Sequence, residues 1–179
     1  MTAESNGVAS WHMLTVVGAD RPGIVARLTG ALYRAGCNLG DASMARLGGN
    51  FAVMLMVEGA DRATLERVLQ PVTDELGLRL HVDPVESAPD GRDEPNMQVT
   101  VYGADRPGIV AQVTGALFAR GFNILDLNSD VGGTREHPVY VMTLDGLAEG
   151  GAAAVEQALA PLRAGGIEVR VTALEPLVG

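Results

Sequence analysis

Residues 18–39 read GADRPGIVARLTGALYRAGCNL, and residues 103–124 read GADRPGIVAQVTGALFARGFNI. The two stretches align without a gap at an offset of 85 residues, and 15 of their 22 positions are identical. Self-similarity at a fixed spacing of this size indicates a repeated structural unit. The 179-residue chain is therefore a duplication, and the repeated unit is about half its length.

Each repeat shows the same order of predicted elements. An alternating strand precedes the GADRPG loop, and apolar residues at helical spacing follow it. The next strand opens at an asparagine and turns at a Gly-rich segment into a strand that is apolar at nearly every position. A second helix and an alternating strand close the unit. The predicted ranges are strands 12–18, 52–57 and 78–82 with helix 63–76, and strands 97–103, 139–144 and 167–171 with helix 152–164.

The order βαββαβ, read twice, predicts an α+β chain of two tandem ferredoxin-like domains. Two crossovers around an antiparallel hairpin give a four-stranded antiparallel sheet with both helices on one face. We place the first domain at 9–85, the second at 97–175, and a polar linker rich in Pro, Asp and Gly at 86–96. The hairpin of the second repeat is predicted to be longer by two residues.

Composition limits the possible partners and locations. The net charge of −9, without a single lysine, opposes contact with a phosphate backbone, so we expect no direct binding to nucleic acid. The longest apolar run, 51–57, is too short to span a bilayer. The single cysteine, Cys37, fits a reducing compartment, and the polar first ten residues lack a signal-peptide pattern. We expect a cytoplasmic protein without membrane contact.

No pattern of catalytic residues is present in the sequence. The three histidines, His12, His81 and His137, have no metal-ligand spacing, and no HExxH, CxxC or nucleophile-elbow motif occurs. Cys37 has no histidine near it in sequence and is interpreted as a packing residue. We therefore predict that the protein is not an enzyme and needs neither a metal nor a cofactor.

The loop motif identifies a family. A strand ending in Gly-x-Asp-Arg-Pro-Gly-Ile, then a helix, then Gly-x-Asn at the next strand, resembles the ACT domain, and both repeats carry it. Two ACT units with no other domain are similar to the glycine cleavage system transcriptional repressor family. The segments 36–41 and 43–47 resemble that group's first repeat. The resemblance covers essentially the whole chain and implies ferredoxin-like folds and regulation by amino acids.

The same loop has the chemistry of a ligand site. Unpaired N–H groups at a helix start, here near a glycine, favour a carboxylate, and an aspartate before them suits an ammonium group. The resemblance implies that each loop faces the strand-opening asparagine of a neighbouring unit, so that Asp20 would act with Asn123 and Asp105 with Asn38. The candidate ligand-binding residues are Asp20, Arg21, Pro22, Gly23, Ile24, Asn38, Asp105, Arg106, Pro107, Gly108, Ile109 and Asn123.

Simpler roles exist for the same residues. Asp20 and Asp105 are also suitable N-caps of the helices that follow them. Asn38 and Asn123 are also typical of post-helix turns with unusual backbone angles. The loop arginines fit an exposed, solvated position. Two residues before each aspartate, where related domains often carry a side-chain donor, both repeats have glycine and offer only backbone.

Together these features suggest a non-enzymatic regulatory protein. We expect it to bind a small amino acid such as glycine at ACT interfaces and to modulate a partner, following the resemblance a transcriptional regulator of glycine cleavage genes. Pairing of exposed sheet edges would give a homodimer. The alternative is a ligand-free ACT module that dimerises and modulates an enzyme of amino-acid metabolism.

Overall fold

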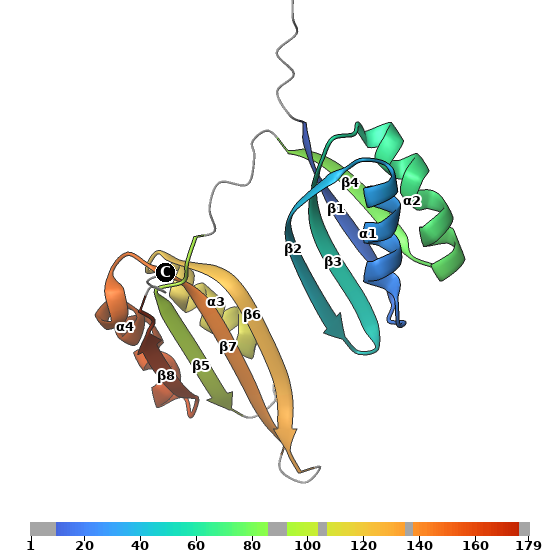
Figure 1. Ribbon diagram of the computed structural model, residues 1–179. Helices are drawn as coiled ribbons and strands as arrows, with labels where there is room; N and C mark the ends of the chain where they lie inside the picture. Colours follow the sequence, from blue (N-terminus) through green and yellow to red (C-terminus); the bar gives the residue numbers. More distant parts are fainter. Residues whose placement is uncertain (1–9, 86–92, 104–106, 135–137, 176–179) are drawn as a thin grey trace, which may run out of the picture. The chain divides into compact units, whose positions relative to one another are not determined.

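The computed structural model describes residues 10–85, 93–103, 107–134 and 138–175. The chain divides into two compact units, Met1–Gly91 and Arg92–Gly179. Each unit has its own four-stranded sheet and its own hydrophobic core, as Figure 1 shows for the first unit in blue to green and for the second in yellow-green to red. The two units are described separately below.

The first unit has the predicted order of elements. Its sheet has the strand order β2-β3-β1-β4, and every pair of neighbours is antiparallel. The predicted ferredoxin-like fold is therefore confirmed here. The elements are β1 (Trp11–Ala19), α1 (Ile24–Arg34), β2 (Asn38–Leu47), β3 (Asn50–Glu58), α2 (Arg62–Leu76) and β4 (Arg79–Val85).

The second unit repeats this topology. Its strand order is β6-β7-β5-β8, again with antiparallel neighbours throughout. The prediction of two tandem ferredoxin-like folds is thus confirmed for both repeats. The elements are β5 (Met97–Gly103), α3 (Ile109–Phe118), β6 (Phe122–Gly133), β7 (Pro138–Ala148), α4 (Gly151–Ala164) and β8 (Glu168–Ala173).

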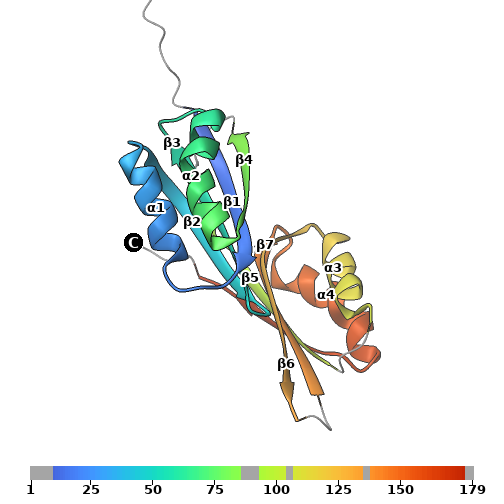
Figure 2. The same ribbon diagram turned by 90° about the vertical axis from the view of Figure 1, so that its right-hand side faces the viewer.

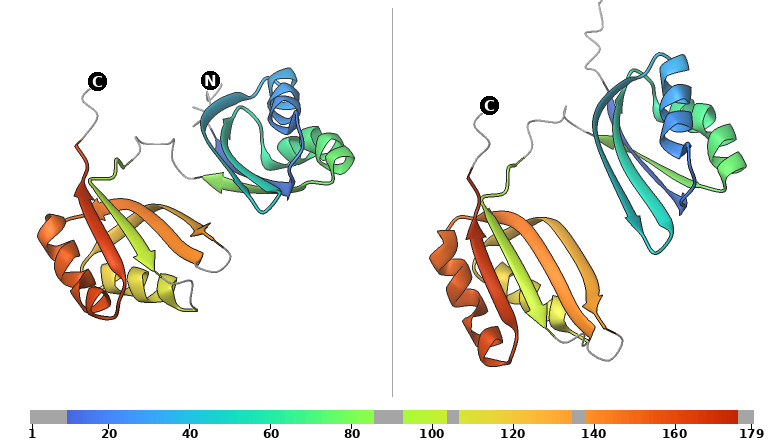
Figure 3. Two further views of the ribbon diagram at one scale, coloured as in Figure 1. Left: turned by 90° about the horizontal axis from the view of Figure 1, so that it is seen from below. Right: turned by 60° about the horizontal axis from the view of Figure 1, so that its bottom comes forward.

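The core of each unit lies between one face of the sheet and the two helices. In β1, burial alternates so that His12, Leu14 and Val16 face the helices. Fully buried leucines of α1 and α2, among them Leu28 and Leu69, pack on that face. Figures 2 and 3 show both helices of each unit on the same side of its sheet. Amphipathic strands and helices therefore cover each other, as the alternating pattern requires.

The two hairpins differ more than predicted. The first turns through Gly48 and Gly49, whose φ angles of 56° and 75° are those of a tight two-residue hairpin turn. In the sheets, Gly18 pairs with Phe51 and Gly103 with Tyr140. Equivalent residues of β3 and β7 are thus 89 positions apart in the sequence, whereas those of β1 and β5 are 85 apart. The second hairpin is therefore longer by four residues, not two. Alternation alone does not reveal this difference, because two and four residues leave the same side chains on the same face.

One edge strand in each unit is exposed along most of its length. Every residue of β2 is exposed, and so is β6 from Leu125 onward. These strands stand at the edge of their sheets, where one row of backbone groups has no partner strand within the unit. Such edges suit pairing with another chain. Dimerisation through them stays a prediction.

Candidate ligand-binding site

The loop before α1 ends in a glycine that starts the helix. Gly23 is the N-cap, with φ 86° in the left-handed region, and no side chain caps the first turn. The alternative role of Asp20 as an N-cap is therefore wrong. Glycine is suited to this position because a positive φ strains residues that carry a Cβ. The first N–H groups of α1 are consequently free of a side-chain acceptor from the loop.

The first turn of α1 opens on a hollow of about 330 Å³. Its lining combines the predicted loop with two residues that the sequence did not suggest, Met44 of β2 and Phe51 of β3. The lining residues are Asp20, Arg21, Gly23, Ile24, Val25, Ala26, Met44 and Phe51. A small anionic group in this hollow would lie at the positive end of the helix dipole.

Arg46 of β2 contacts the predicted loop across the hairpin. Its Nη2 lies 2.6 Å from Oδ2 of Asp20, whose side chain is 23% exposed. The backbone N–H of Asp20 also donates to the carbonyl oxygen of Gly49 at 3.0 Å. Arg46 was not predicted from the sequence, because no local pattern links it to Asp20, which lies 26 residues earlier. The Asp20 carboxylate is already paired, so a ligand ammonium group at this carboxylate would compete with a guanidinium.

The corresponding loop of the second unit is described only in part. Asp105 and Arg106 lie outside the described residues, so their predicted roles stay untested. Gly108 caps α3 with φ 91° and without a side-chain cap, as Gly23 does for α1. The strand position of Arg46, which pairs with Phe51, is taken here by Val131, which pairs with Tyr140. The second unit therefore has no cation at the place from which Arg46 reaches Asp20.

Asn38 lies at the opposite end of the first sheet from the loop. It opens β2 opposite Glu58, whereas Ala19, just before Asp20, pairs with Asn50 near the hairpin turn. The ten residues of β2 separate these two ends, a distance of about 30 Å at 3.3 Å per residue. The fold of a single unit thus does not bring its own loop and its own asparagine together.

The two asparagines are strand residues and not turn residues. Asn38 belongs to β2 and Asn123 to β6, and within the described residues only glycines have a positive φ. The left-handed positions are the glycines that precede them, Gly36 with φ 75° and Gly121 with φ 72°. The alternative role as turn residues with unusual angles is therefore wrong for both, and each side chain is held at a defined position in a sheet.

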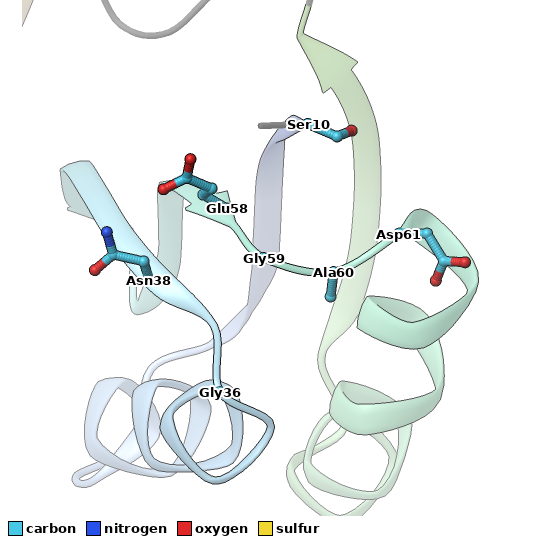
Figure 4. A pocket seen from close by; sticks show the side chains of 7 residues that line it. All are labelled: Ser10, Gly36, Asn38, Glu58, Gly59, Ala60 and Asp61. Carbon is cyan, nitrogen blue, oxygen red and sulfur yellow. The ribbon is translucent and has the colours of Figure 1, made fainter. Parts of the chain in front are cut away.

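A second hollow, of about 470 Å³, surrounds Asn38 (Figure 4). It lies where the end of α1, the start of β2 and the connection from β3 to α2 meet. Figure 4 shows the side chains of Asn38 and Glu58 projecting in the same direction from their neighbouring strands. The lining residues are Ser10, Gly36, Asn38, Glu58, Gly59, Ala60 and Asp61. Glu58 and Asp61 give this hollow a negative character that the sequence motif did not predict.

Asp61 has a structural role at the edge of this hollow. It is the N-cap of α2, and its Oδ1 accepts a hydrogen bond from the backbone N–H of Thr64 at 2.8 Å. Hydrogen bonding by Thr64 lowers the pKa of Asp61 below its ordinary value. A carboxyl group with a lowered pKa stabilises the fold above its unfolded-state pKa, and this contribution is lost as the pH falls through the folded-state pKa.

This gives a pH-dependent prediction for Asp61→Asn. Asparagine also caps helices but does not titrate in this range, so the variant should be less stable than the wild type at pH 7. As the pH falls below about 4, the ordinary range of the aspartate pKa, the difference in stability should shrink toward zero. Urea denaturation midpoints of both proteins between pH 7 and pH 2.5 measure it. A difference that stays constant over this range would contradict the assignment.

The remaining reactive groups of the described residues form no catalytic arrangement. Cys37 is half-buried, and burial raises the pKa of its thiol, which disfavours the nucleophilic thiolate. No group of three or more potential metal ligands occurs among residues 10–85, 93–103, 107–134 and 138–175. No helix in those ranges is long and apolar enough to cross a bilayer. The candidate site is therefore assigned to the two hollows of the first unit that contain predicted ligand-binding residues.

Residues 12–83 and 97–164 each match the ACT domain, so the two repeats account for most of the chain. The chain belongs to the ACT-domain family and carries two ACT domains in tandem. It is a homologue of the glycine cleavage system transcriptional repressor of Escherichia coli strain K12 and of Shigella flexneri, with 32% identity over 126 residues to each. The match covers 68% of this chain and 66% of the length of each repressor, slightly less than two thirds.

Two crystal structures have the same fold over nearly the whole chain. An unknown protein from Galdieria sulphuraria superposes with a TM-score of 0.78 at 24% identity, covering 93% of this chain and 99% of its own. A protein provisionally assigned as a glycine cleavage system transcriptional repressor superposes with a TM-score of 0.68 at 18% identity, covering 94% and 99%. At these identities the similarity supports the tandem fold and says nothing about ligands.

Proposed function

We propose that this protein is a non-enzymatic, cytoplasmic regulator that binds a small amino acid, glycine or a similar one, at its ACT domains. The observation that carries the proposal is the start of α1. Its N–H groups have no side-chain cap, and the left-handed Gly23 leaves them open to a hollow of about 330 Å³. Unpaired N–H groups and the helix dipole together favour a carboxylate, which every free amino acid carries.

The other end of the ligand is assigned to a strand-opening asparagine. Because a unit's own loop and asparagine lie about 30 Å apart, a small ligand that contacts both must use the asparagine of a neighbouring ACT unit. The sequence resemblance implies the same arrangement. The proposed ligand-binding residues are the loop residues 20–24 and 105–109 with Asn38 and Asn123.

The partner is proposed to be a protein. The net charge of −9 disfavours direct contact with DNA. The relatives are named as transcriptional repressors of the glycine cleavage system, so we propose a transcriptional regulator of glycine cleavage genes as the partner. Co-purification from cells with and without added glycine tests this point, and recovery of no transcription factor in either condition would contradict it.

A specific observation favours the second candidate function, a ligand-free ACT module that dimerises and modulates an enzyme. The Asp20 carboxylate is already satisfied by Arg46 at 2.6 Å, so this part of the loop needs no ligand for its charge to be balanced. The exposed edge strands β2 and β6 would then provide the function through pairing.

A thermal-shift screen of the full chain against the common amino acids separates the two functions. A ligand at a hundred times its dissociation constant adds about 2.7 kcal/mol to the folded state, and this raises the melting temperature by several degrees in a domain of this size. We expect a selective shift with a small amino acid, glycine and serine foremost. No shift with any amino acid would support the ligand-free module.

Single alanine variants locate the binding residues in the same screen. Asn38→Ala and Asn123→Ala should each reduce the shift if the strand-opening asparagines contact the ligand. Asn128→Ala is the matched control, since the Asn128 amide donates a hydrogen bond to Asp126 on the exposed strand β6 and is not a candidate ligand-binding residue. An equal loss of the shift in the control would indicate a general loss of stability.

A further inference from the structure

The hollow around Asn38 has an unbalanced charge. Two carboxylates, of Glu58 and Asp61, line it together with the hydroxyl of Ser10 and the amide of Asn38, and its described lining residues include no arginine, lysine or histidine. Asp61 is used as the N-cap of α2. No hydrogen bond or ion pair joins the Glu58 side chain to another residue in the described part of the chain. A free carboxylate in a concave site favours a cationic ligand group.

Glu58 and Asn38 are placed to bind the same group. They are direct partners in the antiparallel pair of β2 and β3, so their Cβ atoms lie about 5 Å apart on one face of the sheet. Both side chains extend in the same direction (Figure 4). An ammonium group has three N–H donors, and the carboxylate of Glu58 and the amide oxygen of Asn38 are two acceptors that it can reach together.

A further feature of this end of β1 is a buried polar atom of His12. His12 is 4% exposed, and its Nδ1 has no hydrogen-bond partner among the residues that the structure describes. It follows Ser10, which lines the hollow, by two residues on the chain entering β1. Buried polar atoms without partners are rare in folded proteins. Met97, the equivalent residue of the second unit, has no such atom.

The loop of the same unit has the opposite charge pattern. Arg46 forms an ion pair with the Asp20 carboxylate. The first turn of α1, which has no side-chain cap, adds N–H donors beside this pair. A guanidinium with helix N–H groups suits a carboxylate better than an ammonium group. Within the first unit the loop therefore suits a carboxylate and the Asn38 hollow suits an ammonium group. Because the two places lie about 30 Å apart, one amino acid that uses both must contact the loop of one ACT unit and the Asn38 hollow of another.

The second unit lacks the acidic partner. Asn123 pairs in register with Leu147, which stands where Glu58 stands in the first unit. The backbone N–H of Ala148, the residue after Leu147, donates a hydrogen bond to Oδ1 of Asn96 at 2.9 Å. The asparagines of the two repeats are therefore not equivalent, since Asn38 pairs directly with an acidic residue and Asn123 with a leucine.

From these observations we infer that Glu58, together with Asn38, recognises the ammonium group of the ligand and so selects amino acids over other small carboxylates. This inference rests on the proposed function, because it concerns the same ligand. It assigns the ammonium end to Glu58 and not to Asp20. Glu58 is then a specificity-determining residue. The equivalent residue of the second repeat, Leu147, is apolar.

The test compares two ligands that differ only in the amino group. Glycine and serine are titrated by calorimetry into the full-length protein in parallel with glycolate and glycerate, in which a hydroxyl replaces the amine. The proteins are the wild type, Glu58→Gln and Asp20→Asn, with Glu149→Gln as a control that removes one exposed carboxylate of the second unit. Melting without ligand verifies that each variant folds.

We expect the wild type to bind the amino acid at least tenfold more tightly than its hydroxy acid. Glu58→Gln should weaken amino-acid binding about tenfold or more and leave hydroxy-acid binding unchanged, since it removes a charge-assisted hydrogen bond to the amine. Asp20→Asn and Glu149→Gln should keep the preference. Loss of the preference in Asp20→Asn, or its persistence in Glu58→Gln, would overturn the inference while leaving amino-acid binding intact. A wild type that binds none of the four compounds would overturn the proposed function itself.

Discussion

Replacement of Gly146 by alanine is expected to destabilise the second unit by about 3 kcal/mol, as overpacking against rigid surroundings does. A Cβ at this position would come well inside 3.0 Å of the carbonyl oxygen of Asn123 and of the ring of Phe122. The backbone of β6 cannot move away freely, because β6 and β7 pair in register on both sides of the irregularity between Ile124 and Asp126. The strain therefore falls on the strand that carries a candidate ligand-binding residue.

Gly115→Ala is the matched control for this variant. Gly115 lies within α3, and a Cβ there would have no heavy atom within 4 Å. Alanine in a helix interior is more stable than glycine by about 0.5–1 kcal/mol, so this variant should be slightly stabilised. Urea denaturation measures the change in the free energy of unfolding for both variants. Hydrogen exchange of peptides from each unit shows which unit is affected. Equal stability of the two variants would show that the β6–β7 pairing accommodates the methyl group.

Leu28→Ala should cost the first unit about 3 kcal/mol, within the 2–5 kcal/mol typical of such truncations. The Leu28 side chain is fully buried between α1 and the sheet, where it belongs to the same core as Val53 of β3 and Leu69 of α2. Its removal leaves a cavity that small, closely packed units fill poorly. For a unit of this size, such a loss is a large part of the total stability.

The control for this cavity is Val25→Ala on the same helix. Val25 is 39% exposed, so its truncation removes little buried surface and should change stability by less than about 1 kcal/mol. Hydrogen exchange should show lost protection in α1 and β1 of Leu28→Ala and unchanged protection in β5 and β7. A uniform loss of protection in both units would mean that they unfold as one cooperative block.

Much of the fold was predictable because its signals are local or repeated. The duplication of the GADRPG loop, the helical spacing that follows it and the alternation of 97–103 are all contained in short stretches of chain, and they placed the strands and helices of both units correctly. Gly36 and Gly121, with φ angles of 75° and 72°, follow the first helix of each repeat, and this position likewise needs only a backbone angle that glycine allows.

The candidate site was predicted only in part. The loop does end at a helix start whose N–H groups have no side-chain cap, as predicted. The N-cap residue, however, is Gly23 and not Asp20. Asp20 is interpreted as available for a ligand because no local pattern in the sequence pairs it with a basic side chain. Arg46 reaches it from β2 only because the tight turn at Gly48 and Gly49 folds that strand back beside the loop.

The sequence by itself determined the duplication and the ferredoxin-like order of elements, because both depend on patterns within short stretches of the chain. Only the tertiary structure decided which side chains face one another across strands. The register of β2 against β3 sets Glu58 beside Asn38, and the four-residue longer hairpin sets Leu147 beside Asn123. Strand register follows from pairing over long separations in sequence, so these neighbours, and the charges they bring to the site, appear only in the folded chain.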